Sequence, residues 1–266
     1  MSESTAPPER RTAYWTSVGD SWSRRRPQRL WRAHSDAVNR ALLARWLPRA
    51  CGRLLKTDAF DEAFGEGLIG GAPRAEDVWL IDLSATILAE ARRTRRSSKA
   101  IVADVRRLPF PTGFFGTVVS ISTLDHFDGR GDIEASIAEI HRVLSPGGCL
   151  IVTMDNPRNP VVALRNRLPW GWLNRVGLVP YYVGTTLDSR SLVETLERAG
   201  FDVTDVDALQ HVPRAPTVAA AAVVSRLGWG GAERAFLAAV GSFERLRGRA
   251  SRFRTGYFVA ARGIRR

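Results

Sequence analysis

Three aspartates lie where their side chains could bind a nucleotide. Asp58, Asp82 and Asp104 each follow an apolar run typical of a buried strand, and residues 85–96 between the last two have a helical pattern. In a parallel α/β sheet, ligands bind outside the carboxyl ends of the strands. A carboxylate has two acceptor oxygens, so Asp82 can accept hydrogen bonds from both hydroxyls of a ribose. The pattern predicts a nucleotide-binding edge on such a sheet.

Asp125 and His126 form a second group that could do chemistry, and they follow the fourth apolar run. A histidine that titrates near neutral pH can take a proton from an alcohol or a phenol, so both residues are candidate catalytic groups. The alternative is a loop histidine that only hydrogen-bonds the backbone. His141 and His211 are expected to be structural. The four histidines and two cysteines show no ligand spacing, so no metal site is predicted.

The elements that position these residues follow from apolar runs that alternate with helical patterns. A final strand reached after a long excursion is expected to pair antiparallel with the sixth. Helices are predicted over residues 31–47, 84–96, 132–144 and 188–199, with one or two more over 217–247. Strands are predicted over residues 54–57, 78–81, 101–103, 117–122, 149–154, 201–210 and 257–262.

The chain divides into three parts. Residues 1–12 are expected to be a disordered tail, residues 13–50 an N-terminal helical segment, and residues 51–266 an α/β domain with insertions at about 156–184 and 213–250. The first insertion is rich in proline, tryptophan and tyrosine. Together with the apolar residues 217–239, it is expected to roof an apolar acceptor site, while a subunit interface or additional core packing is the alternative.

The composition limits the partners and the compartment. The 266 residues carry a net charge of +12, and all but two of the 39 basic residues are arginine. This excess predicts an anionic partner, whereas a GC-rich genome is the alternative origin of the bias. Arginines around the apolar segment suggest peripheral contact with an anionic membrane. No nucleic-acid module is recognisable. Two cysteines and the lack of a signal peptide predict a cytoplasmic protein.

In their order and spacing, four features resemble the class I S-adenosylmethionine-dependent methyltransferases of the small-molecule type. The resemblance covers residues 54–200 and the final strand. The turn before the fifth strand is the most specific of the four. The features are Ile81-Asp82-Leu83-Ser84 with the helix after it, Ala103-Asp104-Val105 with Leu108-Pro109-Phe110, Ile140-His141-Arg142-Val143-Leu144-Ser145-Pro146-Gly147-Gly148, and the last strand.

The resemblance implies a Rossmann-like sheet of seven strands, mostly parallel with the last one antiparallel, preceded by an N-terminal helical lead-in and carrying cap insertions. It implies S-adenosyl-L-methionine as the cofactor and a methyl transfer to an oxygen, nitrogen or carbon of a hydrophobic small molecule. The cofactor-binding residues that it implies are Asp58, Asp61, Asp82, Leu83, Asp104, Val105 and Ser122.

The turn after the first strand departs from the family pattern. Three glycine positions hold Asp58, Phe60 and Glu62, and Lys56 stands where an acid is common. Phe60 is expected to crowd the cofactor, and Lys56 is expected to form a buried ion pair with Asp58 or Asp61. Two interpretations follow: a remodelled loop that still binds the cofactor, or a non-catalytic protein that binds another ligand or partner with the same fold.

Overall fold

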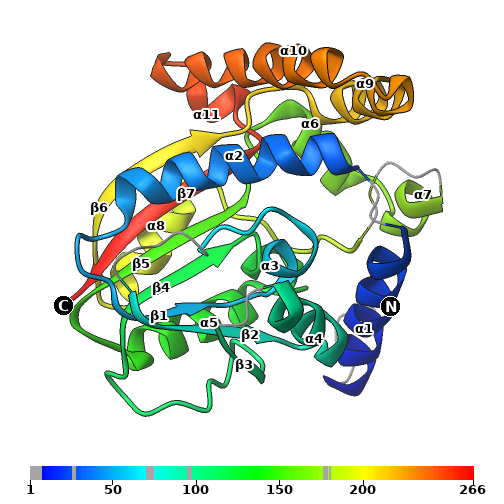
Figure 1. The fold of residues 1–266 in the computed structure, drawn as a ribbon. Helices are drawn as coiled ribbons and strands as arrows, with labels where there is room; N and C mark the ends of the chain where they lie inside the picture. Colours follow the sequence, from blue (N-terminus) through cyan, green and yellow to red (C-terminus); the bar gives the residue numbers. More distant parts are fainter. Residues whose placement is uncertain (1–7, 26–27, 70–74, 95–97, 176–178, 180) are drawn as a thin grey trace.

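The computed structural model describes residues 8–25, 28–69, 75–94, 98–175, 179 and 181–266. Its strands form one sheet in the order β3-β2-β1-β4-β5-β7-β6 (Figure 1). Neighbouring strands run parallel, except that β7 is antiparallel to both β5 and β6. This confirms the predicted Rossmann-like sheet. The strands are β1 (Gly52–Lys56), β2 (Ala75–Asp82), β3 (Lys99–Val102), β4 (Phe115–Ile121), β5 (Leu144–Asp155), β6 (Phe201–Leu209) and β7 (Phe258–Arg265).

Helices cover both faces of this sheet and extend beyond its upper edge (Figure 1). Ser84 caps α4 as its position before the helix suggests, because its Oγ accepts a hydrogen bond from the N–H of Ile87. The helices are α1 (Pro8–Arg25), α2 (Arg29–Trp46), α3 (Phe60–Phe64), α4 (Ala85–Thr94), α5 (Arg130–Val143), α6 (Pro160–Arg167), α7 (Trp170–Arg175), α8 (Ser189–Arg198), α9 (Arg214–Leu227), α10 (Gly230–Gly241) and α11 (Arg252–Thr255), with the 3-10 helices η1 (Leu124–His126) and η2 (Ser242–Gly248).

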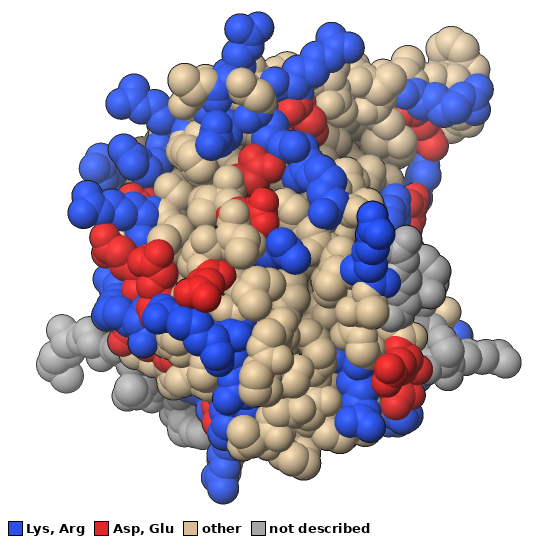
Figure 2. Space-filling view, turned by 90° about the vertical axis from the view of Figure 1, so that its left-hand side faces the viewer, with Lys and Arg blue, Asp and Glu red and all other residues tan. Residues whose placement is uncertain are grey.

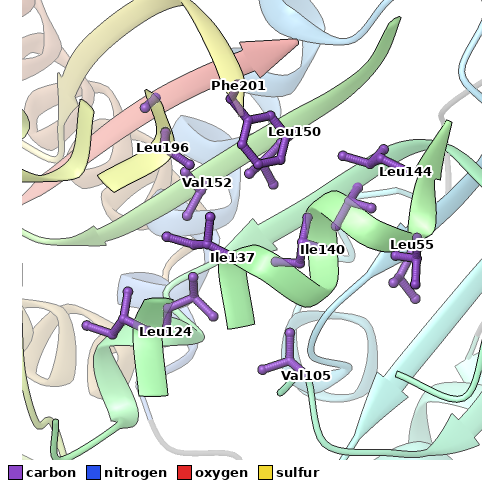
Figure 3. Packing of buried hydrophobic residues seen from close by; sticks show 14 of the residues in the cluster. Leu55, Val105, Leu124, Ile137, Ile140, Leu144, Leu150, Val152, Leu196 and Phe201 are labelled. Atoms are coloured by element: carbon purple, nitrogen blue, oxygen red, sulfur yellow. The ribbon is translucent and has the colours of Figure 1, made fainter. Parts of the chain in front are cut away.

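The core has two layers because successive side chains of a strand point to opposite faces of the sheet. On one face, α5 and α8 pack against alternate residues of β4 and β5. Figure 3 shows Ile137 and Ile140 of α5 beside Leu150 and Val152 of β5. On the other face, α2 packs against the intervening residues, among them Ile151. Helices packed on both faces therefore support the strands and their ends.

Two differences from the sequence prediction are larger than the shifts of up to three residues at the other strand and helix ends. Residues 8–12, expected to belong to the disordered tail, are helical in α1, while residues 1–7 lie outside the described residues. The turn at residues 145–148 lies inside β5 and not before it. Leu144 already pairs with Phe115, and the ladder then resumes at Cys149 opposite Thr117. The Pro-Gly-Gly sequence therefore forms a bulge in β5, since proline and glycine suit irregular strand positions.

The C-terminal helices form a separate layer above α2 (Figure 1). Trp31 of α2 packs there against Val212 and Val240, with Phe236 of α10 against this cluster.

Apolar side chains remain exposed near the turn between α9 and α10, among them Leu227 and Trp229. Among the described residues, no helix is long and apolar enough to cross a bilayer. Contact of helices α9 and α10 with an anionic membrane stays a prediction.

The positive charge is not gathered into one patch on the face drawn in Figure 2. Lys and Arg side chains are spread over that face, with Asp and Glu side chains among them. Several of these opposite charges form pairs on the surface, such as Arg262 with Asp205 and Arg266 with Asp202. Exposed pairs of this kind contribute little to stability, and their main effect is on the surface potential.

Candidate functional site

A cavity of about 540 Å³ lies at the carboxyl ends of the parallel strands, between them and helices α1 and α2. Its wall brings together side chains from the strand ends and aromatic side chains from α1, α2 and residues 170–182. His126 lines the cavity, whereas Asp125 lies behind it, fully buried. The lining includes all seven residues predicted to bind the cofactor: Asp58, Asp61, Asp82, Leu83, Asp104, Val105 and Ser122.

Asp82 ends β2 and faces this cavity. Its Oδ1 accepts a hydrogen bond of 2.9 Å from the N–H of Ser84, and its Oδ2 accepts one of 3.1 Å from the N–H of Ala59. Burial outweighs these bonds and raises the pKa of Asp82 to about 6. Each carboxylate oxygen has a further acceptor position, so hydroxyl donors from a ligand can be accepted there.

Asp104 follows β3 and has a different charge environment. Its Oδ2 accepts a hydrogen bond of 2.5 Å from Arg106, which also reaches Asp132. Burial alone would raise the pKa of Asp104, but the hydrogen bonds from Arg106 lower it. Asp104 is therefore a stable carboxylate beside Val105 on the cavity wall.

Charged side chains, and not glycines, hold the turn after β1. The ammonium of Lys56 is fully buried and lies 2.8 Å from Oδ1 of Asp58 and 3.2 Å from Oδ2 of Asp61. The predicted ion pair is thus made with both acids. Asp58 Oδ1 also accepts the N–H of Phe60 at 3.2 Å. No residue in the range 57–62 has a positive φ, so the backbone of this turn does not require glycine.

The two acids of this turn do not leave an excess of negative charge. Nη2 of Arg32, from α2, lies 3.0 Å from Oδ1 of Asp61. Lys56 and Arg32 together lower the pKa of Asp61, although burial acts in the opposite direction. Phe60 lines the cavity, and its ring packs against Trp22 with 5.0 Å between centroids. The guanidinium of Arg32 lies over the same ring at 4.8 Å.

The segment after β4 turns sharply at Ser122, whose φ of 48° is unusual for a residue other than glycine. Ser122 Oγ donates a hydrogen bond of 3.0 Å to Oδ2 of Asp125, and the N–H of Asp155 donates to the same oxygen at 2.9 Å. Oδ1 of Asp125 accepts no hydrogen bond from the described residues. Burial raises the pKa of Asp125. This side chain cannot touch a substrate, so any role it has acts through His126.

His126 is held in one orientation. Its Nδ1 lies 2.7 Å from the carbonyl oxygen of Tyr182, so Nδ1 carries the proton and donates it to that oxygen. In the neutral imidazole, Nε2 is then the acceptor, and it lies 4.0 Å from Oδ1 of Asp125. The imidazole packs against Trp15 with 4.7 Å between ring centroids. This geometry leaves Nε2 able to accept a proton beside a carboxylate.

The aromatic residues of the first insertion line the cavity as the sequence suggests, namely Trp170, Tyr181 and Tyr182. The second apolar segment does not: none of the residues 217–239 is part of the described lining. This segment packs above α2 instead, so α2 and α1 provide the roof that it was expected to form. The prediction was wrong because an apolar helix does not show which surface it covers.

Sequence reasoning missed several cavity residues because they lie far apart along the chain. Arg32 and Ser35 come from α2, whereas Gln210 and Arg214 follow β6. Gln210 has a φ of 55°, an uncommon backbone conformation that occurs at functional sites. No motif in the sequence marks these residues, although an arginine at the start of an apolar helix was a weak signal.

Comparison with known proteins agrees with this geometry. Residues 43–152 match the family described as Methyltransferase domain. These residues are a class I methyltransferase domain. Membership implies S-adenosyl-L-methionine as the cofactor. The matched range contains β1 to β4 and most of β5, including the strand ends that carry Asp58, Asp82 and Asp104.

Curated relatives of the methyltransferase domain differ in their acceptors. Malonyl-(acyl-carrier protein) O-methyltransferase of Enterobacter lignolyticus is 34% identical over 115 residues, covering 42% of this chain and 43% of that protein. Demethylmenaquinone methyltransferase of Thermus thermophilus is 35% identical over 133 residues, covering 44% of this chain and 59% of that protein. The chain matches about half the length of these relatives. The similarity therefore does not show that this chain acts on the same acceptor molecules.

The likeness to solved structures extends over most of the chain and not only over the matched range. The cyclase SpnF superposes with a TM-score of 0.58 and 21% identity, covering 86% of this chain and 81% of that one. At this identity the likeness concerns the fold alone. A cyclase with this fold also means that the architecture does not by itself decide the reaction.

The residues of the methyltransferase domain fit S-adenosylmethionine by their chemistry. Carboxylates from the ends of three adjacent strands, Asp58, Asp82 and Asp104, line one cavity. A ribose supplies two hydroxyl donors, and the methionine end carries an ammonium and a sulfonium, both of which favour nearby carboxylates. Asp82 lacks a cation within 4.0 Å among the described residues, so it is well placed to accept neutral hydroxyl donors.

Proposed function

We propose that the protein is a methyltransferase that uses S-adenosylmethionine to methylate an oxygen, nitrogen or carbon atom of a hydrophobic small molecule. One observation supports this most directly: the acids at the strand ends and the aromatic side chains line the same cavity, with His126 on its wall. A cofactor and an apolar acceptor can therefore meet without an additional domain.

In this proposal, some residues of the chain bind the cofactor and the acceptor, and another residue takes up a proton. When bound, the cofactor supplies a methyl group on a positively charged sulfur. Asp82 would accept hydrogen bonds from the ribose, and the carboxylate of Asp58, although paired with Lys56, would lie near the methionine end as a hydrogen-bond acceptor. The aromatic walls orient an apolar acceptor and exclude water, and positioning is the largest part of such catalysis.

His126 is the proposed general base when the acceptor is a hydroxyl group. Its Nδ1 donates to Tyr182, so the proton from the acceptor goes to Nε2. The resulting imidazolium faces Oδ1 of Asp125 at 4.0 Å, and that carboxylate stabilises the positive charge. Asp125 is thus proposed as a positioning residue, since it is fully buried.

The turn after β1 favours a second candidate function. A protein that keeps this fold without methyl transfer would bind another ligand in the cavity. The residues at the glycine positions, Asp58, Phe60 and Glu62, favour this alternative, and Glu62 already accepts hydrogen bonds from the N–H groups of Leu68 and Ile69.

A transfer assay separates the two functions. The purified full-length chain is given S-adenosylmethionine with a panel of hydrophobic phenols, quinols, amines and acids, and release of S-adenosylhomocysteine is followed. We expect turnover with at least one acceptor. His126→Gln should keep cofactor affinity and lower the rate with a hydroxyl acceptor by about 10²- to 10⁴-fold. Binding of the cofactor without turnover on any acceptor would favour the non-catalytic function.

A further inference from the structure

Three arginines are part of the described cavity lining, and two of them are paired with carboxylates. Nη2 of Arg11 lies 3.2 Å from Oδ2 of Asp128, and Nη2 of Arg32 lies 3.0 Å from Oδ1 of Asp61. Arg214 differs from both, because no carboxylate oxygen of the described residues lies within 4.0 Å of its nitrogens.

Arg214 lies against aromatic rings and has most of its hydrogen-bonding capacity unused. Its guanidinium is 5.7 Å from the ring centroid of Trp31 and 5.5 Å from that of Tyr257. Its one hydrogen bond to a described residue is a long one of 3.5 Å to the hydroxyl of Tyr257. A guanidinium has five N–H donors in a planar fork that matches the oxygens of a carboxylate or a phosphate.

The carboxylates near Arg214 lie behind the cavity wall. Asp155 contacts Nη1 of Arg165, which also donates to the Tyr257 hydroxyl at 3.0 Å. Asp125 lies further back, where its Oδ2 accepts the N–H of Asp155. None of Asp155, Arg165 and Asp125 is part of the cavity lining, and each is at most 9% exposed. A molecule in the cavity therefore meets the cation of this cluster and not its acids.

A second polar side chain of this lining belongs to Gln210, which lies four residues before Arg214 in the sequence. It is only 1% exposed and lines the cavity. Its Nε2 donates a hydrogen bond of 2.6 Å to Ser35, whereas its Oε1 accepts none from the described residues. A buried acceptor without a partner is unfavourable, so a ligand donor that reaches it gains a hydrogen bond.

The start of α9 adds positive potential at Arg214. This helix of 14 residues begins at Arg214, and no side chain caps its first N–H groups. The unpaired N–H groups of a first turn carry a partial positive charge, which favours an anion there. Among the first-turn residues 214–217 only Arg214 is part of the cavity lining, and Pro216 has no N–H, so the guanidinium is the main cationic group of this region.

We propose that the methyl acceptor is an apolar or aromatic molecule that carries an anionic group, a carboxylate or a phosphate, which Arg214 binds through paired N–H···O contacts. A hydroxyl or amine of the same molecule donates to Oε1 of Gln210, and the aromatic wall holds its apolar body. This proposal depends on the proposed function, because it names the acceptor class of that site.

Calorimetric titration of the full-length chain with three probes of one shape tests the proposal. The probes are 2-naphthoate, 2-naphthyl phosphate and the neutral 2-naphthamide. We expect at least one anionic probe to bind about tenfold more tightly than the amide, a difference of about 1.4 kcal/mol. The tighter of the two anions identifies whether the group is a carboxylate or a phosphate.

Two variants of Arg214 and one control locate the effect. Arg214→Gln should reduce the preference for the anion to less than threefold, and Arg214→Lys should keep part of it because the charge remains. Arg226→Gln is the matched control, since this arginine is in the same helix but exposed. It should bind all three probes like the unmodified chain. Thermal unfolding of each variant confirms that it is folded.

The outcomes separate this inference from the proposed function. Equal affinity for all probes, no binding of an anion at millimolar concentration, or a preference that survives in Arg214→Gln overturns the anion site. S-adenosylmethionine is titrated into the same proteins. Cofactor binding without an anion preference leaves the proposed function standing, whereas an anion preference without cofactor binding removes methyl transfer and keeps the anion site.

Discussion

At the residue scale, the proposed cofactor binding depends on the charge of Asp82. Burial raises its pKa to about 6, above its ordinary value, because its acceptor bonds from Ala59 and Ser84 offset only part of the lost hydration. Below that pH the carboxyl is protonated and loses acceptor capacity. Hydroxyl donors of a ribose stabilise the ionised form, so affinity should fall as the pH falls from 7 to 5.

Lys56 is the residue that permits acids in the turn after β1. It is fully buried and close to both Asp58 and Asp61, whose negative charges raise its pKa despite the burial. Removing one member of such a buried group leaves the other charges uncompensated, which costs more than the group itself contributes to stability.

We predict that Lys56→Met lowers the free energy of unfolding by about 3–5 kcal/mol, because Asp58 and Asp61 lose their buried cation. Urea unfolding measures the change.

The only other lysine provides the control. Lys99 pairs with Asp77 at 2.9 Å on the surface, and its side chain is 50% exposed. Lys99→Met should cost about 0.2–1 kcal/mol, as exposed pairs do. If the two variants lose the same stability, the buried network around Lys56 does not hold the turn.

At the element scale, the segment at residues 181–185 positions the proposed base. The N–H of Gly184 donates to the carbonyl of Asp125 at 2.7 Å, and the N–H of Thr185 donates to that of Phe127 at 2.7 Å. These bonds hold the segment beside η1, where the carbonyl oxygen of Tyr182 accepts a hydrogen bond from Nδ1 of His126. The orientation of His126 therefore depends on a segment far away in the sequence.

We predict that Gly184→Ala lowers the transfer rate with a hydroxyl acceptor by at least tenfold while cofactor affinity is kept. A Cβ at this position would overlap the carbonyl oxygen of Phe127, so the segment must move and release His126. Gly171→Ala is the control, since a Cβ there meets no atom within 4 Å. An unchanged rate in Gly184→Ala would show that the segment does not position the base.

The elements also show which features follow from local sequence. The apolar runs and helical patterns predicted the strands along the chain, because burial on both faces of a parallel sheet leaves a clear signal. The bulge at residues 145–148 was read as a turn before β5, since Pro-Gly-Gly suits both. The covering of α2 by α9 and α10 was missed, because an apolar surface does not identify its partner.

At the scale of the whole molecule, the cavity is made by segments that the fold brings together. Asp82 and Asp104 were predicted from their strands, because parallel strands end at one edge. Arg214, Gln210 and Trp31 could not be predicted as neighbours, since the first two follow β6 and the third is in α2. The paired charges of Arg32 and Asp61 likewise depend on how α2 crosses the sheet.

The most direct test of the account is calorimetric titration of the full-length chain with S-adenosylmethionine and S-adenosylhomocysteine, beside Asp82→Ala. The account predicts micromolar binding that weakens between pH 7 and pH 5 and is lost in the variant. The Lys56 turn would then be a working substitute for a glycine-rich one. No binding of either compound at millimolar concentration would contradict it, and the cavity would serve a ligand other than this cofactor.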